Sequence, residues 1–155
     1  MDIHISLFFP TARQGPSPLM SKQSDAWLRL IQNVGNIEAD VGKLLQAEHG
    51  LGLSEYRALH VLSLSQNGEL RLQELALHLS LNQSSVSRMV ERLERLGLTI
   101  RDICPDDKRG VYTVLTDKGR EYLENAQSSY ENALDTAIKE HGYGRLVSRN
   151  TVKSD

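Results

Sequence analysis

Apolar residues recur at helical spacing in two short runs near the middle of the chain, and a tight break separates the runs. The first run consists of Leu72, Leu75, Ala76 and Leu79, and the second of Val86, Met89 or Val90, Leu93 and Leu96. The break is Ser80-Leu81-Asn82, in which Asn82 is suited to cap the second helix, and Gly97 is suited to end it. Two short amphipathic helices joined by so tight a turn are typical of a helix-turn-helix.

β-branched and apolar residues follow the second helix, in residues 98–104 and 110–115. Residues 105–110, PDDKRG, lie between these segments and have the composition of a charged turn. The two segments therefore predict a β-hairpin, and residues 69–71 predict a third, very short strand beside it. A helix-turn-helix followed by such a hairpin is a winged helix.

Two longer helical patterns flank this winged helix, which we call the head. They cover residues 25–48 and 117–140, and each carries one apolar stripe. The stripe of the first comprises Trp27, Leu30, Ile31, Val34, Ile37, Val41, Leu44 and Leu45. The stripe of the second comprises Tyr122, Leu123, Ala126, Tyr130, Ala133, Leu134, Ala137 and Ile138. A head of this size cannot bury both stripes alone, so we expect a homodimer. Thr116 is a suitable cap for the last helix, and Ser54 for a short helix over residues 55–65.

The predicted fold class is mainly α (α+β), a winged helix-turn-helix with long flanking helices that form a dimerisation region. Its domain spans residues 21–140, with the head at about 53–115. Residues 1–20 are either an extended arm or an upstream extension without function, because an alternating apolar run gives way there to three prolines. Residues 141–155 form a short, atypical C-terminal tail.

The net charge of −2 does not exclude a nucleic-acid ligand, because the position of the cations matters more than their sum. Six cations fall within 22 residues, namely Arg88, Arg92, Arg95, Arg101, Lys108 and Arg109. A solvated helix surface is the alternative interpretation of the same arginines. No apolar run approaches the roughly 18 residues that a membrane span needs, so we expect no membrane partner.

Enzyme and metal functions find little support in the sequence, which has no Gly-rich phosphate loop, HExxH or GxSxG motif. The five histidines show no ligand-like spacing, so we predict no metal and no other cofactor. The single cysteine, Cys104, fits a reducing cytoplasm. A redox switch at Cys104 is disfavoured, because Asp102, Asp106 and Asp107 oppose the lowered thiol pKa that such a switch requires.

The order of short motifs resembles the MarR (multiple antibiotic resistance regulator) family of bacterial repressors. The motifs are Val86-Ser87-Arg88, LERLGL at 93–98, Arg101, DKRG at 107–110 and LTDKG at 115–119. The resemblance implies a dimeric transcription regulator, a repressor that binds double-stranded DNA at a pseudo-palindromic operator with half-sites about 10 base pairs apart. A further C-terminal helix normally completes the family's dimer, and the tail here predicts that this helix is short or missing.

The candidate DNA-binding residues lie on the second helix of the helix-turn-helix and in the hairpin. They are Gln83, Ser84, Ser85, Ser87, Arg88, Arg92, Arg95, Arg101, Lys108 and Arg109. The side chains at the start of the helix are suited to base edges, whereas Arg92, Arg95 and Arg101 are suited to phosphates. The resemblance implies that Arg109 reaches into the minor groove and that Asp107 supports the wing, which is the predicted hairpin. For Asp107, an ordinary turn aspartate is the alternative.

The resemblance also implies a small aromatic or anionic effector that binds between the long helices and the head. Candidate lining residues, each equally suited to a simple core position, are Trp27, Tyr56, His60 and Tyr112. The rival function is a winged-helix protein interaction module that has lost DNA binding. Retention of Arg88, Lys108 and Arg109 favours the regulator.

Overall fold

A computed structural model describes residues 21–103 and 110–142 of this chain. Predictions for the N-terminal arm, Cys104, Asp107, Lys108, Arg109 and the tail after residue 142 lie outside these ranges. The chain divides into two compact units, Met1–Val34 and Gly35–Asp155, and the boundary falls within the first helix. No helix of the described ranges is long and apolar enough to cross a membrane.

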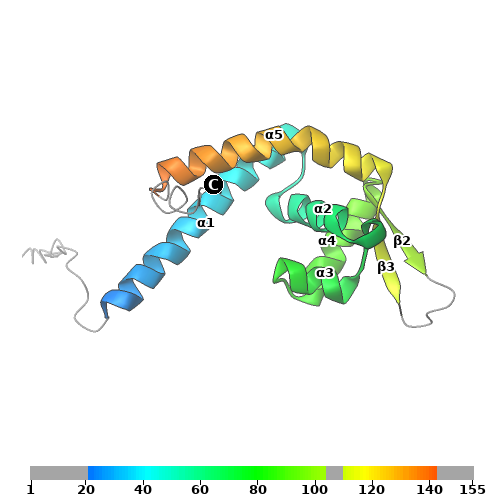
Figure 1. Ribbon diagram of the computed structural model, residues 1–155, viewed down its shortest axis with the longest axis horizontal. Helices are drawn as coiled ribbons and strands as arrows, with labels where there is room; N and C mark the ends of the chain where they lie inside the picture. The colour runs from blue at the N-terminus through cyan, green and yellow to red at the C-terminus, as the bar shows by residue number, and fades with distance from the viewer. Residues whose placement is uncertain (1–20, 104–109, 143–155) are drawn as a thin grey trace, which may run out of the picture. The chain divides into compact units, whose positions relative to one another are not determined.

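The described residues form a mainly helical chain with one small sheet, which confirms the predicted fold class (Figure 1). Its elements are α1 (Lys22–His49), α2 (Leu53–Leu64), the 3-10 turn η1 (Gln66–Gly68), β1 (Glu69–Arg71), α3 (Leu72–Leu79), α4 (Gln83–Arg95), β2 (Thr99–Ile103), β3 (Val111–Leu115) and α5 (Asp117–Glu140). The sheet is antiparallel with strand order β1-β3-β2, so the short strand over 69–71 is confirmed. Thr99 pairs with Leu115 and Ile103 with Val111 along the hairpin.

Helices α3 and α4 form the expected helix-turn-helix. Ser80 ends α3 in the left-handed conformation, with a φ of 54°, and the Oδ1 atom of Asn82 accepts a hydrogen bond of 2.8 Å from the backbone N–H of Ser85. The inward face of both helices is buried, including Leu75, Val86 and Leu93. Both Met89 and Val90 are buried, whereas Leu96, which the period had assigned to the stripe, is 43% exposed because the helix has ended before it.

Helix α2 begins earlier than predicted, and its cap is Gly52 rather than Ser54. The Glu55 carboxylate accepts a hydrogen bond of 2.9 Å from the backbone N–H of Gly52, so a side chain within the first turn satisfies the helix end. Ser54 is exposed on the first turn of the helix. The Ser54 prediction is therefore wrong, because the side chain that caps the helix end is Glu55, three residues after Gly52.

Two hydrophobic clusters fill the unit Gly35–Asp155. The first lies in the head and joins α2, α3, α4 and the sheet through residues such as Leu59, Leu62 and Leu93. The second joins the C-terminal half of α1 to α5, and its buried members are Val41, Leu45, Tyr56, Ala126, Ala133 and Ala137. The three buried alanines are the small members of the stripe predicted for α5.

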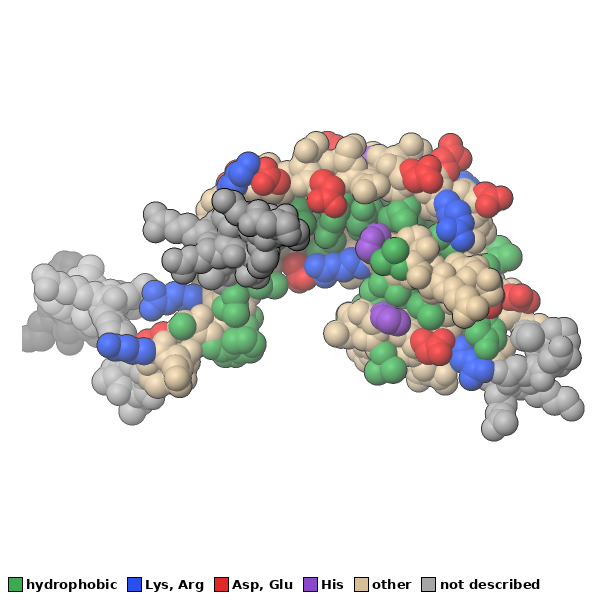
Figure 2. Space-filling model, viewed as in Figure 1, with side chains coloured by type: hydrophobic (Ala, Val, Ile, Leu, Met, Phe, Trp, Pro, Cys, Tyr) green, Lys and Arg blue, Asp and Glu red, His purple; other side chains and the backbone are tan. Residues whose placement is uncertain are grey.

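The N-terminal half of α1 has a different environment. Its apolar side chains are exposed: Trp27 at 60%, Leu28 at 49%, Leu30 at 36%, Ile31 at 50% and Val34 at 44%. Figure 2 shows hydrophobic side chains gathered on the visible face of this part of the helix. The stripe predicted over residues 25–48 is therefore buried only in its second half within one chain.

Gly119 lies where α5 starts against the end of α4, and it explains why the LTDKG segment ends in glycine. A Cβ atom there would lie 2.2 Å from the carbonyl oxygen of Leu98 and 2.7 Å from the Cδ1 atom of Leu115. We expect Gly119→Ala to destabilise the fold by at least about 1–3 kcal/mol, because the clash involves backbone that cannot rotate away. The midpoint of urea unfolding at unchanged slope measures this loss.

The matched control for this prediction is Gly35→Ala in α1. No atom lies within 4 Å of a Cβ built on Gly35, and alanine is favoured over glycine inside a helix by about 1 kcal/mol. Gly35→Ala should therefore leave stability unchanged or raise it. Equal stability of Gly119→Ala and the parent chain would contradict the close packing of α5 on the end of α4.

Candidate nucleic-acid interface

The first two turns of α4 present a polar surface, because the apolar face of the helix is buried in the core. Gln83, Ser84, Ser85 and Arg88 are exposed, and Ser87 is half-buried. A shallow depression brings several of these side chains together, with lining residues Leu72, Gln83, Ser84, Ser87, Arg88 and Glu91. Hydroxyl, amide and guanidinium groups at this spacing are suited to hydrogen bonds with base edges.

Glu91 is the one polar residue of this group that is not among the candidate DNA-binding residues. Its carboxylate repels phosphate, but it is suited to accept a hydrogen bond from the N4 amine of cytosine. The signal was available, since Glu91 lies three residues after Arg88 on the same helix face.

The cations of α4 and β2 differ in what they already bind. Arg88 and Arg95 make no hydrogen bond or ion pair within residues 21–103 and 110–142, and both are exposed. Arg101 pairs with Glu94, with 3.3 Å between Nε and Oε1 and 3.4 Å between Nη2 and Oε2. Because Arg101 remains 49% exposed, this pair is weak and the guanidinium can still reach a phosphate.

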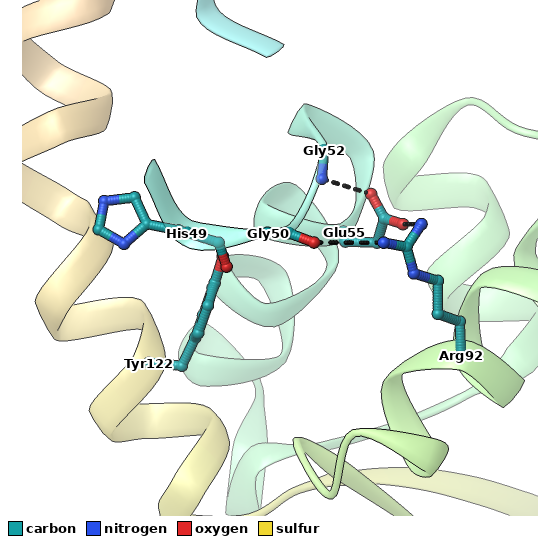
Figure 3. A network of polar contacts seen from close by, with 6 residues as sticks. All are labelled: His49, Gly50, Gly52, Glu55, Arg92 and Tyr122. Atoms are coloured by element: carbon teal, nitrogen blue, oxygen red, sulfur yellow. Dashed lines mark hydrogen bonds and ion pairs between the residues drawn. The ribbon is translucent and has the colours of Figure 1, made fainter. Parts of the chain in front are cut away.

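Arg92 points toward the turn between α1 and α2, and its side chain remains 43% exposed (Figure 3). Its Nη1 atom lies 3.1 Å from Oε1 of Glu55, and its Nη2 atom donates a hydrogen bond of 3.2 Å to the carbonyl of Gly50. The predicted phosphate contact of Arg92 stays a prediction, but these internal bonds give the side chain another role. The sequence reasoning missed Glu55, whose signal was its place three residues after a glycine helix cap.

The described part of the wing carries one more arginine contact. Arg71 of β1 donates from Nε to the hydroxyl of Tyr112 at 3.0 Å, and its guanidinium lies 5.3 Å from the centre of the Tyr112 ring. This contact ties β1 to β3 and places Tyr112 on the sheet. The candidate DNA-binding residues Lys108 and Arg109, and the wing support Asp107, lie outside the described residues.

A cavity of about 460 Å³ lies between α2 and α5. Its lining residues are Tyr56, Arg57, His60, Ser63, Leu123, Gln127, Tyr130, Glu131 and Leu134. The rings of Tyr56 and Tyr130 stack with 4.5 Å between their centres. Burial raises the pKa of Tyr56, and the neighbouring Tyr130 and Glu131 add to this effect, so its hydroxyl stays protonated at neutral pH.

Two of the four predicted pocket residues, Tyr56 and His60, line this cavity, and the other two do not. Tyr112 packs under Arg71 on the sheet instead. Trp27 lies on α1 and is not among the lining residues, which all come from α2 and α5. Aromatic character alone does not distinguish a pocket residue from one on a sheet surface or a helix face.

One cluster of potential metal ligands was not visible in the sequence spacing. Asp40, Glu140 and His141 offer ligand atoms within 4.8 Å of one another, although Asp40 and His141 are far apart in the chain. The Nε2 atom of His141 lies 2.9 Å from Oδ2 of Asp40. Within the described residues this contact joins α1 to the C-terminal end of α5.

The α3–α4 pair and the three-stranded sheet β1-β3-β2 define the class: this is a winged helix-turn-helix domain. The MarR family model matches residues 53–111, which run from α2 to the start of β3. Residues 53–111 thus form a MarR-type domain, and all but the last of the motifs noted in the sequence lie within it.

Individual relatives agree with this assignment. The HTH-type transcriptional regulator YkoM of Bacillus subtilis (strain 168) is 40% identical over 77 residues, which cover 50% of this chain and 49% of YkoM. The transcriptional repressor MprA of Escherichia coli (strain K12) is 28% identical over 92 residues, or 59% of this chain and 52% of MprA. The chain thus spans about half the length of these curated relatives.

Solved structures extend the similarity beyond the head. Sco3205, a MarR family transcriptional regulator from Streptomyces coelicolor crystallised in complex with DNA, superposes with a TM-score of 0.72 at 28% identity. The match covers 90% of this chain and 97% of Sco3205, so the long helices belong to the shared fold as well.

Proposed function

We propose that this protein is a sequence-specific DNA-binding transcription regulator, a dimeric repressor that a small molecule releases from its operator. The observation that carries this proposal is the exposed polar start of α4, where Gln83, Ser84 and Arg88 stand on the second helix of a winged helix-turn-helix. The relatives support it, because MprA is a transcriptional repressor and Sco3205 was crystallised with DNA.

In this proposal the start of α4 enters the major groove and reads base edges. Arg95 and Arg101 bind phosphates, which fix the position of the head without reading sequence. The roles of Arg109 in the minor groove and of Asp107 beneath it are retained as predictions from the sequence resemblance. The protein acts in the cytoplasm in this proposal, where bacterial DNA lies, and it performs no catalysis.

The homodimer is proposed from the exposed apolar half of α1. A contiguous apolar surface of this kind marks an interaction site, and a second copy supplies an equal surface by two-fold symmetry. Two heads related by that symmetry then fit the two halves of a pseudo-palindromic operator.

The cavity between α2 and α5 supports a small aromatic or anionic effector. The stacked rings of Tyr56 and Tyr130 provide an aromatic wall, and Arg57 and His60 provide donors for an anionic group. Arg57 also pairs with Glu38 of α1 at 2.7 Å. A ligand that bound Arg57 would compete with this link between α1 and α2.

Duplex binding tests the proposed function. Selection from random duplexes should yield one preferred operator, and its affinity should fall steeply with salt, with a log–log slope of about −0.9 for each phosphate neutralised. Titrations of operator and random duplex at several salt concentrations measure this slope. Failure to bind any duplex at low salt would instead support the protein interaction module.

A further inference from the structure

The turn between α1 and α2 is held from three sides. Glu55 of α2 accepts the Gly52 N–H at 2.9 Å through Oε2 and faces Arg92 of α4 at 3.1 Å through Oε1. Arg92 also binds the Gly50 carbonyl at 3.2 Å. From α5, the hydroxyl of Tyr122 donates to the carbonyl of His49 at 3.2 Å (Figure 3).

Each bond in this network has a fixed donor and acceptor. Burial raises the pKa of Tyr122 to about 12, with the Glu55 carboxylate adding to the rise and Arg92 opposing it, so the phenol keeps its proton at neutral pH. The Glu55 side chain is only 14% exposed and uses both of its oxygens. A mostly buried carboxylate needs its cation, because loss of one partner leaves the other charge poorly solvated.

We propose that Arg92 is a positioning residue for DNA recognition: through Glu55 and Gly50 it sets the orientation of α4 relative to α1 and α5, and it does not bind phosphate. The inference rests on the proposed function, since it concerns how α4, the helix proposed to contact base edges, is oriented. Arg92 lies one helical turn beyond Arg88, so a change of tilt at Arg92 moves the side chains that meet the bases.

Both apolar and charged contacts hold α4 against the α1–α2 turn. The apolar face of α4 packs in the head cluster with α2, α3, the sheet and Leu51 of the α1–α2 turn, and Arg92 adds a charged link to the same turn. In the proposed dimer the α1 and α5 helices of two copies set the spacing of the heads. If a head rotates about this turn, the two heads of the dimer no longer match the spacing of the two operator half-sites. Contacts of each head with the DNA phosphate backbone persist.

The test compares Arg92→Ala and Glu55→Gln with the parent chain on operator and random duplex, across several salt concentrations. Glu55→Gln keeps an oxygen that can accept the Gly52 N–H, so helix α2 retains its cap while the charge pair is lost. Measurements are made at a temperature where urea unfolding shows each variant to be folded. Arg95→Ala, an exposed α4 arginine without a partner in the described residues, is the matched comparison.

A positioning role predicts that each variant lowers the preference for operator over random duplex by about three- to tenfold, within the range of coupled side-chain pairs. The salt slope should stay at the parent value, and the double variant should be no worse than the worse single variant. Glu55→Gln is the sharpest case, because removal of a negative charge would strengthen binding if electrostatics alone operated.

A phosphate contact predicts the opposite pattern. Arg92→Ala would then reduce the magnitude of the salt slope by about 0.9 and weaken both duplexes equally, as expected for Arg95→Ala, and Glu55→Gln would bind as well as or better than the parent. That result overturns the inference while the proposed function stands. A parent chain that binds no duplex overturns the proposed function itself.

Discussion

Arg88→Ala is expected to lower the preference for operator over random duplex by about 1–3 kcal/mol, which is roughly 5- to 150-fold. The guanidinium is exposed at the start of α4 and has no partner among the residues that the structure describes. Its removal therefore breaks no bond among the described residues, and we expect the whole effect to be on the free energy of DNA binding. A bidentate contact of arginine to guanine accounts for an effect of this size.

Arg95→Ala is the control, since Arg95 lies on the same helix and is likewise exposed and unpaired within the described residues. It should weaken operator and random duplex about equally, as a phosphate contact does. Competition titrations with both duplexes at one salt concentration separate the two variants. Equal weakening of both duplexes by Arg88→Ala would mean that the start of α4 does not read bases.

Periodicity alone predicted the helix-turn-helix, because burial of one helix face decides the pattern of apolar residues. Leu75, Val86 and Leu93 are each fully buried, and the polar residues between them had no other place than the surface. Residue type located the wing strands and the cap of α5 at Thr116, whose hydroxyl accepts the Gly119 N–H at 3.0 Å.

Contacts between distant segments were not predictable from the pattern. Arg92 and Glu55 are far apart in the chain, and helical spacing placed Arg92 on the polar face without indicating that its guanidinium reaches back to the α1–α2 turn. The cap of α2 was missed for a related reason, since Ser54 is a frequent capping residue by type but Glu55 makes the bond here. Residue type gives a preference, and the fold selects among the candidates.

Exposure of the N-terminal half of α1 leads to the last prediction, that Ile31→Glu converts the proposed dimer to a monomer at micromolar concentration. Burial of an isoleucine side chain contributes about 1.5–3 kcal/mol, and two-fold symmetry removes two such side chains and adds two charges to the interface. Ile31 is 50% exposed in the single chain, so its replacement costs little within the subunit.

Loss of the dimer should lower operator affinity by about 10²- to 10⁴-fold, because the second head no longer binds at high effective concentration. Light scattering measures the mass, and titration of the full operator beside a single half-site measures the advantage of two heads. Gln46→Glu adds a charge to an exposed position of the same helix, in the half whose stripe is already buried, and should change neither quantity. Because half-site binding needs one head only, Ile31→Glu should retain it. A variant that stays dimeric with full operator affinity would show that this apolar surface does not join the two subunits. Another interface would then have to produce the two-fold arrangement of the α4 helices.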